Sequence, residues 1–176
     1  MSDSANPNAL PRSVAGDLSD EAAMRLALQQ AELAYEAGEV PVGAVVLDEG
    51  GRVIGLGYNR SITDHDPSSH AEIVALRQAA AALKNYRLPG ASLFVTLEPC
   101  AMCMGAMLHA RLCRVVYGAA DPKTGACGSV LSVHESTQLN HRTVVSGGVL
   151  ADECGDMLRR FFRERRAKAK GAGQPH

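Results

Sequence analysis

Apolar positions recur along this chain in two patterns, and these patterns predict helices and strands in alternation. After Ser19, which can cap a helix, apolar residues return every three or four positions until Gly38 ends the pattern. Two short apolar runs flank a turn at 48–51 and predict a β-hairpin. The predicted helices span about 20–37, 100–110 and 151–170, and a further one starts at Ser68 or Ser69 and runs through His70 to about residue 83. The predicted strands span 42–47, 53–58, 92–97 and 114–119, with Val144 and Val145 extending the sheet.

This alternation indicates an α/β layered domain with helices over a central sheet. A chain of 176 residues is long enough to bury one substantial core, and no linker or internal repeat divides it. We therefore expect a single domain over 19–170. Residues 1–18 are rich in Ser, Pro, Asn and Gly and lack periodicity, so we expect a flexible tail there and a disordered end at 171–176.

The composition is ordinary for a soluble globular protein, with 46% hydrophobic residues, 21% charged residues and a formal net charge of −1. No apolar run approaches the roughly 20 residues that cross a bilayer, and the N-terminus lacks the pattern of a secretory signal. Five cysteines are an odd number and favour reduced thiols, so we expect a cytoplasmic protein with no membrane partner. A chain this close to neutral can bind nucleic acid only through a local basic patch.

Two motifs contain residue types that commonly serve as zinc ligands. His-Ala-Glu at 70–72 opens one predicted helix, and Pro-Cys-Ala-Met-Cys at 99–103 opens the next. One imidazole and two thiolates suit Zn²⁺, and three protein ligands leave the fourth tetrahedral position open for water. Within a helix, Cys100 and Cys103 would project from one side, whereas His70 and Glu72 would diverge. We therefore expect His70, Cys100 and Cys103 to bind the metal and Glu72 to stay free.

An open zinc position beside a free carboxylate is typical of hydrolytic chemistry. Zinc lowers the pKa of its bound water toward about 7, so hydroxide forms near neutral pH. Glu72 would accept the proton of that water as hydroxide attacks an amino-bearing ring carbon, and would then protonate the ring nitrogen and the departing ammonia. The combined pattern is the signature of zinc-dependent nucleobase deaminases, whose known examples include a tRNA adenosine deaminase.

Each motif alone allows other interpretations. Pro-Cys-x-x-Cys also occurs in redox dithiols and in structural zinc sites, and His-x-Glu is common on ordinary helices. A structural zinc site would need a fourth protein ligand, but the remaining cysteines have no partner at metal-ligand spacing and are interpreted as buried or incidental thiols. The residues that could serve as a fourth ligand are Cys113, Cys127, Cys154, His65, His109, His134 and His141.

Longer segments around these motifs resemble one family. They closely resemble the bacterial tRNA-specific adenosine deaminases, and the resemblance extends over nearly all of 20–170. It implies a three-layer α/β/α cytidine deaminase-like fold, with a central mixed five-stranded sheet and the metal-binding helices on one face. The matching segments are 66–73 (DPSSHAEI), 85–88 (NYRL), 96–103 (TLEPCAMC) and 123–129 (KTGACGS), with 40–44 and 140–142 in addition.

The resemblance also implies an activity, a cofactor and partners. The activity is hydrolytic deamination of adenosine to inosine at the wobble position of a tRNA anticodon, with one Zn²⁺ per subunit of a homodimer. Asn59 matches the family's base-contacting amide, although Asn also stabilises loops. Tyr58 stands where relatives can carry Trp and is expected to form a flat wall. An alternative is a zinc deaminase of a free base, nucleoside or nucleotide, such as cytosine or guanine, without RNA.

The predicted C-terminal helix supplies a local basic patch. From residue 156 to 170, seven positive residues outnumber two negative ones, so the segment carries +5 while the whole chain carries −1. Phe161 and Phe162 lie within it, and we expect at least one of them to pack inward. Basic residues with aromatics suit phosphate contact and base stacking, as in a tRNA anticodon stem-loop. We expect Arg163 and Arg166 to contact RNA, with Lys123 as a further phosphate contact.

The third predicted helix offers a candidate dimer face. Met102, Met104 and Met107 could form an apolar surface on it, together with Gly105 and Ala106. Methionine is common at adaptable interfaces, but it also fills cores. The homodimer therefore depends mainly on the family resemblance.

Overall fold

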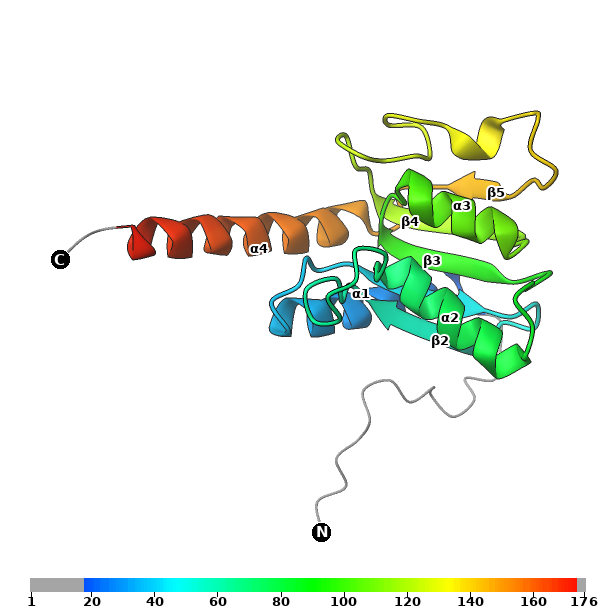
Figure 1. Ribbon diagram of the computed structural model, residues 1–176, viewed down its shortest axis with the longest axis horizontal. Coiled ribbons are helices and arrows are strands. Elements are labelled where there is room, and N and C mark those ends of the chain that lie inside the picture. The colour runs from blue at the N-terminus through cyan, green and yellow to red at the C-terminus, as the bar shows by residue number, and fades with distance from the viewer. Residues whose placement is uncertain (1–17, 174–176) are drawn as a thin grey trace, which may run out of the picture.

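The computed structural model describes residues 18–173, and its helices and strands follow the predicted order. None of the helices in this range is long and apolar enough to cross a membrane. Figure 1 shows the elements, which are α1 (Asp20–Glu36), β1 (Gly43–Leu47), β2 (Val53–Tyr58), α2 (Ala71–Leu83), β3 (Ser92–Leu97), α3 (Ala101–His109), β4 (Arg114–Ala119), a 3₁₀ turn (Val133–Glu135), β5 (Val144–Ser146) and α4 (Ala151–Ala172).

The strands form one mixed five-stranded sheet in the order β2-β1-β3-β4-β5. β1 runs antiparallel to β2 and β3, whereas β3, β4 and β5 are parallel to one another. Because β3 and β4 are parallel, their carboxyl ends meet at one edge of the sheet, where Leu97 pairs with Ala119. The second motif, at 99–103, follows β3 and therefore starts at this edge.

Helices cover both faces of the sheet and give three layers (Figure 1). Successive strand residues point to opposite faces, so Val95 packs with α2 and α3 while its neighbour Phe94 packs with α1 and α4. The predicted α/β/α fold, with the helices of both motifs on one face, is confirmed. Met104 and Met107 of α3 are fully buried in the core, and of the three methionines only Met102 is exposed, so the predicted methionine surface is wrong for two of its three residues.

Two glycines let helices rest directly on the sheet. A Cβ atom at Gly43 would lie 2.0 Å from the carbonyl oxygen of Ala27 in α1, and one at Gly57 would lie 2.3 Å from that of Ala71 in α2. Both distances are too short for any side chain. Ala71 begins α2, so the backbone contact at Gly57 fixes the height of the first turn of α2 above β2.

α4 begins against the sheet and ends away from it. Phe161 is 5% exposed, whereas every residue from 162 to 173 is exposed, and Figure 1 shows this half of the helix projecting beyond the sheet. The helix continues to Ala172, into the segment expected to be disordered. Leu18, expected in the tail, packs against the core on the α1 side. The rest of the predicted tail, 1–17, and residues 174–176 lie outside the described residues.

Candidate active site

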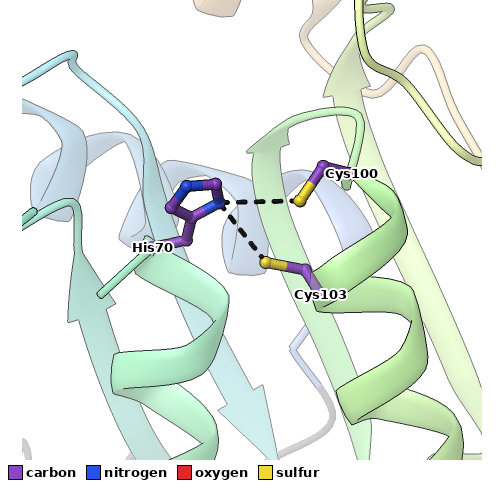
Figure 2. Close-up of side chains that lie close together, drawn as sticks. All are labelled: His70, Cys100 and Cys103. Atoms are coloured by element: carbon purple, nitrogen blue, oxygen red, sulfur yellow. Dashed lines mark hydrogen bonds between the residues drawn. The ribbon is translucent and has the colours of Figure 1, made fainter. Parts of the chain in front are cut away.

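Three side chains from the two motifs converge between the starts of α2 and α3. Figure 2 shows the Nδ1 atom of His70 facing the sulfur atoms of Cys100 and Cys103, at 3.6 Å from each. The three ligand atoms all lie within 4.8 Å of one another. No further His, Cys, Asp or Glu joins this cluster in the part of the chain that the structure describes.

These distances fit zinc. With Zn–S near 2.3 Å and Zn–N near 2.05 Å, a tetrahedral site separates the nitrogen from each sulfur by about 3.6 Å. The structure has this separation for both sulfur atoms. The donor set of one imidazole and two thiols is also one that zinc prefers, and a three-ligand cluster leaves one tetrahedral position for a water or substrate atom.

The first ligand of each motif precedes its helix instead of lying within it. His70 is the N-cap of α2 and Cys100 is the N-cap of α3, and both have extended backbone. The prediction placed His70 and Glu72 on the same helix, with their side chains diverging. In the structure only Glu72 lies within α2, and the direction of the His70 side chain is set by the extended backbone of the cap. The imidazole of His70 makes no capping hydrogen bond to α2 and is free to face the site. The sulfur of Cys100 interacts with Cys103, one turn further along α3, so the two thiols stay together. The free N–H groups of two helix starts favour negative charge at this point.

The two thiols differ strongly in acidity. A hydrogen bond from Cys103, helped by His70, lowers the pKa of Cys100 to about 4. The same hydrogen bond, together with burial and the nearby Glu72, raises the pKa of Cys103 far above its ordinary range. The hydrogen bond with Cys100 also raises the pKa of His70. The cluster therefore loses its first thiol proton easily, whereas it loses the second only when a bound cation compensates the second negative charge.

Glu72 is the buried carboxyl beside this cluster. It is the second residue of α2, is only 4% exposed, and shares a hydrogen bond with the thiol of Cys103. Burial, the largest influence, raises the pKa of Glu72 to about 7. A carboxyl with a pKa near neutrality can both accept and return a proton at neutral pH.

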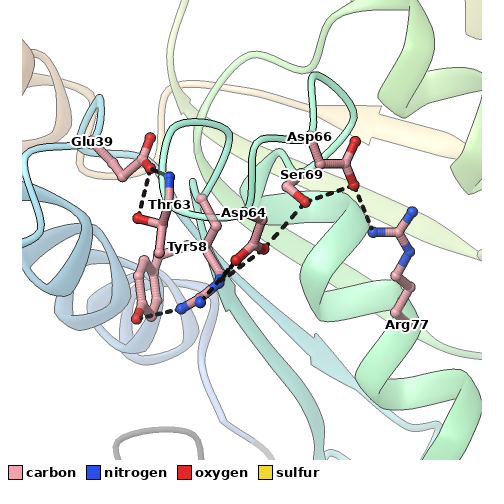
Figure 3. A network of polar contacts seen from close by, with 8 residues as sticks. Glu39, Tyr58, Thr63, Asp64, Asp66, Ser69 and Arg77 are labelled. Carbon is pink, nitrogen blue, oxygen red and sulfur yellow. Dashed lines mark hydrogen bonds and ion pairs between the residues drawn. The ribbon is translucent and has the colours of Figure 1, made fainter.

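A polar network fixes the loop that leads into His70 (Figure 3). Asp66 accepts hydrogen bonds from the backbone N–H and hydroxyl of Ser68, at 2.8 and 2.7 Å, and from the hydroxyl of Ser69 at 3.0 Å. The hydrogen bonds from Ser68, followed by that from Ser69, lower the pKa of Asp66 to about 2. Arg77 of α2 lies 3.6 Å from the same carboxylate and ties the loop to the helix.

A second buried carboxylate, Glu98, organises the loop on the other side of the site. One of its oxygens accepts from the backbone N–H groups of Cys127 and Ser129, and the other accepts from the N–H of Asp121 and the hydroxyl of Ser129. Glu98 is 3% exposed and lies two residues before Cys100. This role of Glu98 is not among the expectations from the sequence, although an acidic residue directly after an apolar strand is a signal for it.

Asn59 links the start of α2 to the segment that precedes β1. Its side-chain oxygen accepts from the N–H of Ala71 at 2.9 Å, and its amide nitrogen donates to the carbonyl of Val40 at 3.1 Å. The amide therefore supports the start of α2, as the loop-stabilising alternative expects. One donor hydrogen and one acceptor lone pair remain on Asn59.

The structure does not bring Tyr58 to the cluster of His70, Cys100 and Cys103. Gly57 faces α2, so the next side chain along β2 points to the opposite face of the sheet. The hydroxyl of Tyr58 accepts from Arg60 at 2.9 Å, and the guanidinium of Arg60 lies 5.4 Å from the ring centre. Figure 3 shows Tyr58 in this polar network. The expected flat wall is therefore not supported by its position.

Lys123, Arg163 and Arg166 come together, although they are far apart in the sequence. They line one cavity of about 780 Å³, with Phe162 and Leu97 among the apolar lining residues. Leu97 ends β3, so the cavity opens at the edge of the sheet that carries Cys100. As expected, one phenylalanine packs inward: Phe161 is buried, whereas Phe162 is 40% exposed.

Known proteins with similar sequences and structures include deaminases. The model of the MafB19-like deaminase family matches residues 18–166. The tRNA-specific adenosine deaminase of Haemophilus influenzae is 50% identical over 151 residues, which cover 86% of this chain and 87% of that protein. A structure solved in a study of A-to-I editing by tRNA deaminases at the wobble position of transfer RNA has a TM-score of 0.75 and 44% identity, covering 77% of this chain and 98% of that one.

A guanine deaminase from Nitrosomonas europaea shares the fold at lower identity. Its TM-score is 0.72 at 28% identity, over 88% of this chain and 89% of that one. The two tRNA-acting relatives have 44% and 50% identity, so the likeness to them is much stronger. The chain belongs to the bacterial tRNA-specific adenosine deaminases, within the MafB19-like deaminase family.

Proposed function

We propose that this protein converts adenosine to inosine at the wobble position of a tRNA anticodon by zinc-dependent hydrolysis. The observation that carries the proposal is the cluster of His70, Cys100 and Cys103 beside the buried carboxyl of Glu72. The preference for tRNA over a free base is supported by the tRNA-acting relatives and by the basic cavity at the same edge of the sheet.

The roles of the chain's own residues follow from this geometry. His70, Cys100 and Cys103 would hold one zinc ion per subunit, and zinc when bound supplies the Lewis acidity that lowers the pKa of a water molecule toward neutrality. Glu72 takes a proton from the attacking water and gives it to the adenine ring nitrogen. It then helps the amino group leave as ammonia, so that adenosine and water yield inosine and ammonia.

The basic cavity is suited to the backbone of a single-stranded loop. Lys123, Arg163 and Arg166 offer positive charge at its rim, and none of them has an ion-pair partner among the described residues. The exposed ring of Phe162 offers a face on which a base beside the wobble nucleotide can stack. We assign the phosphates that flank the target nucleotide to this cavity. Asn59 would contact the target base with its remaining donor and acceptor.

Nucleoside mass analysis tests the reaction. The protein is incubated with a tRNA that carries adenosine at the wobble position, and separately with free adenosine, cytosine and guanine, with and without a chelator. We expect inosine from the tRNA alone, and its loss after metal removal. Inosine from free adenosine only, uracil from cytosine or xanthine from guanine would contradict the assignment.

Salt-dependent binding tests the RNA surface. Replacing Arg163 and Arg166 by Gln should weaken tRNA binding and reduce the slope of log affinity against log salt by about one per lost phosphate contact. The matched control is Arg52→Gln, because Arg52 is an exposed arginine of the distant hairpin. An unchanged slope in the double variant would place the RNA elsewhere.

We also propose a homodimer that acts in the cytoplasm. An apolar groove of about 400 Å³ between α2 and α3 is lined by Ile73, Leu76 and Met102, and Tyr86 at its side is 67% exposed. A groove of this kind suits a second copy of the chain. Met102→Glu should shift the mass in sedimentation equilibrium from dimer to monomer, and a wild-type protein that sediments as a monomer would contradict the dimer.

A further inference from the structure

A second basic pocket lies at the end of the molecule remote from the metal cluster. It has a volume of about 600 Å³, and its lining includes Arg87, Arg111, Arg142 and His141. A hydrogen bond from the N–H of Cys113 to the carbonyl of Ala91 places it at the start of β3 and β4. β3 is six residues long, or about 20 Å, and the metal cluster follows its other end. The pocket is therefore separate from the proposed active site.

The three arginines of this pocket have no ion-pair partner among the residues that the structure describes. No carboxylate among residues 18–173 lies within ion-pair distance of Arg87, Arg111 or Arg142, whereas seven other arginines have such a partner. Glu49 packs on Gly90, which lines the pocket, but it pairs with none of the three. Three guanidinium groups on one concave surface repel one another unless an anion joins them.

The backbone holds one of these arginines in an unusual conformation. Arg111 follows the end of α3 with a φ of 60°, a position where glycine is usual. Its Nη1 atom donates to the carbonyl of Leu108 at 3.2 Å and to the side chain of Asn140 at 3.1 Å. These two contacts fix the guanidinium and leave its other nitrogen atoms without a partner among the described residues.

The other two arginines also keep donors free. Among the described residues, the guanidinium of Arg87 has a close contact with one group, the ring of Tyr86, and lies 5.5 Å from the ring centre. Arg142 has a single long contact of 3.5 Å with the carbonyl of Thr137. Guanidinium groups with free N–H pairs bind phosphate oxygens in a bidentate manner.

We propose that this pocket binds a phosphate group. The phosphate can belong to a free phosphorylated molecule or to the tRNA backbone outside the anticodon loop, and the second source rests on the proposed function. In either case the guanidinium of Arg111, which is held in place, binds the phosphate oxygens, and Arg87 and Arg142 bind them from the surface side of the pocket. The deamination reaction itself does not require this contact.

Two binding measurements on the zinc-loaded protein test the site. The variant replaces Arg87 and Arg142 by Gln and keeps Arg111, because Arg111 also holds the end of α3; Arg52→Gln is the control. In the first arm, isothermal titration with pyrophosphate should show wild-type binding that is weakened about 100-fold in the double variant, since each charge-assisted contact contributes about tenfold or more. In the second arm, affinity is compared for full-length tRNA and for the isolated anticodon stem-loop.

The two arms distinguish the sources of phosphate. If only the double variant loses pyrophosphate binding, the site is supported, and a free phosphorylated molecule is sufficient to occupy it without tRNA. Weaker binding of full-length tRNA with unchanged binding of the stem-loop supports the site and identifies the tRNA backbone. Equal behaviour of the double variant, the control and wild type in both arms overturns the proposal. Deamination of the stem-loop is measured in parallel, so a failure of the proposed function appears as no inosine in any of the three proteins.

Discussion

Replacing Glu98 by Gln removes one negative charge and one acceptor while keeping the shape of the side chain. In the wild type, one carboxylate oxygen accepts from the N–H groups of Cys127 and Ser129 at 3.0 and 3.1 Å. The other oxygen accepts from the N–H of Asp121 at 2.9 Å and from the hydroxyl of Ser129. An amide can keep the first pair of bonds with its oxygen, but its NH₂ group then faces the N–H of Asp121, donor against donor.

The expected loss of stability follows from these bonds. A hydrogen bond to a charged group contributes about 1.5–3 kcal/mol, and a buried donor left without an acceptor costs a similar amount. The hydroxyl of Ser129 can rotate and accept from the new NH₂ group, so the net loss centres on Asp121. We expect the free energy of unfolding to fall by about 3 kcal/mol, which corresponds to roughly 6–12 °C in Tm for a domain of this size.

Urea and thermal unfolding measure this change, with Glu36→Gln as the control, because Glu36 is an exposed carboxylate on α1. A Glu98→Gln variant within about 0.5 kcal/mol of wild type, the range typical of surface substitutions, would refute the account of the loop. The pH dependence gives a second check. Burial favours a raised pKa at Glu98, but the hydrogen bonds from Ser129, Asp121 and Cys127 outweigh it and lower the pKa.

The sign of the pH effect follows from that lowered pKa. A carboxyl whose folded pKa lies below its ordinary value of 4.5 stabilises the fold above that value, and this stabilisation is lost as pH falls through the folded pKa. The difference in stability between wild type and Glu98→Gln should therefore be constant near neutral pH and shrink below about pH 4.5. A difference that grows on acidification would show that the carboxylate is not the stabilised form.

Three further outcomes are expected. Glu72→Gln should keep zinc, as measured by metal analysis, and lose at least about 100-fold in deamination rate; a loss of less than tenfold would exclude its role in proton transfer. Cys100→Ser should purify with far less than one zinc per subunit, and full occupancy would contradict its assignment as a ligand. Gly57→Ala should destabilise the domain by about 1–3 kcal/mol or more and lower zinc occupancy, because its Cβ would lie 2.3 Å from the carbonyl oxygen of Ala71. Gly50→Ala, with no contact closer than 3.4 Å, should change neither stability nor occupancy.

The elements of the fold were predictable because each depends on local periodicity. β1, β2 and α1 have turn or cap residues at their ends, and the structure places their boundaries within one residue of those predicted. The exact starts of the two helices at the metal site were harder to predict. The sequence does not distinguish a cap residue from the first residue within the helix, and only the backbone conformation of His70 and Cys100 identifies them as caps.

Other parts of the site depend on contacts between distant segments. Glu98 receives its hydrogen bonds from residues 23 to 31 positions later, and no local pattern indicates which N–H groups will reach it. Lys123 and Arg163 share a cavity only because α4 returns to the edge of the sheet. The family resemblance led to the prediction that Tyr58 forms a flat wall of the site. The structure points its side chain to the other face of the sheet, because Gly57 before it faces α2.

The contact of Gly57 with Ala71 also limits how this domain can change over evolutionary time. In most of the core, a methyl group lost from one residue can be compensated by one gained at its neighbour. Between β2 and the beginning of α2 there is no side chain to exchange, and the spacing there is determined by the dimensions of the polypeptide itself. Substitutions in the surrounding core can therefore change the shape of the interior. Glu72 keeps its position, because it follows Ala71 at the start of α2, where the backbone contact sets the spacing.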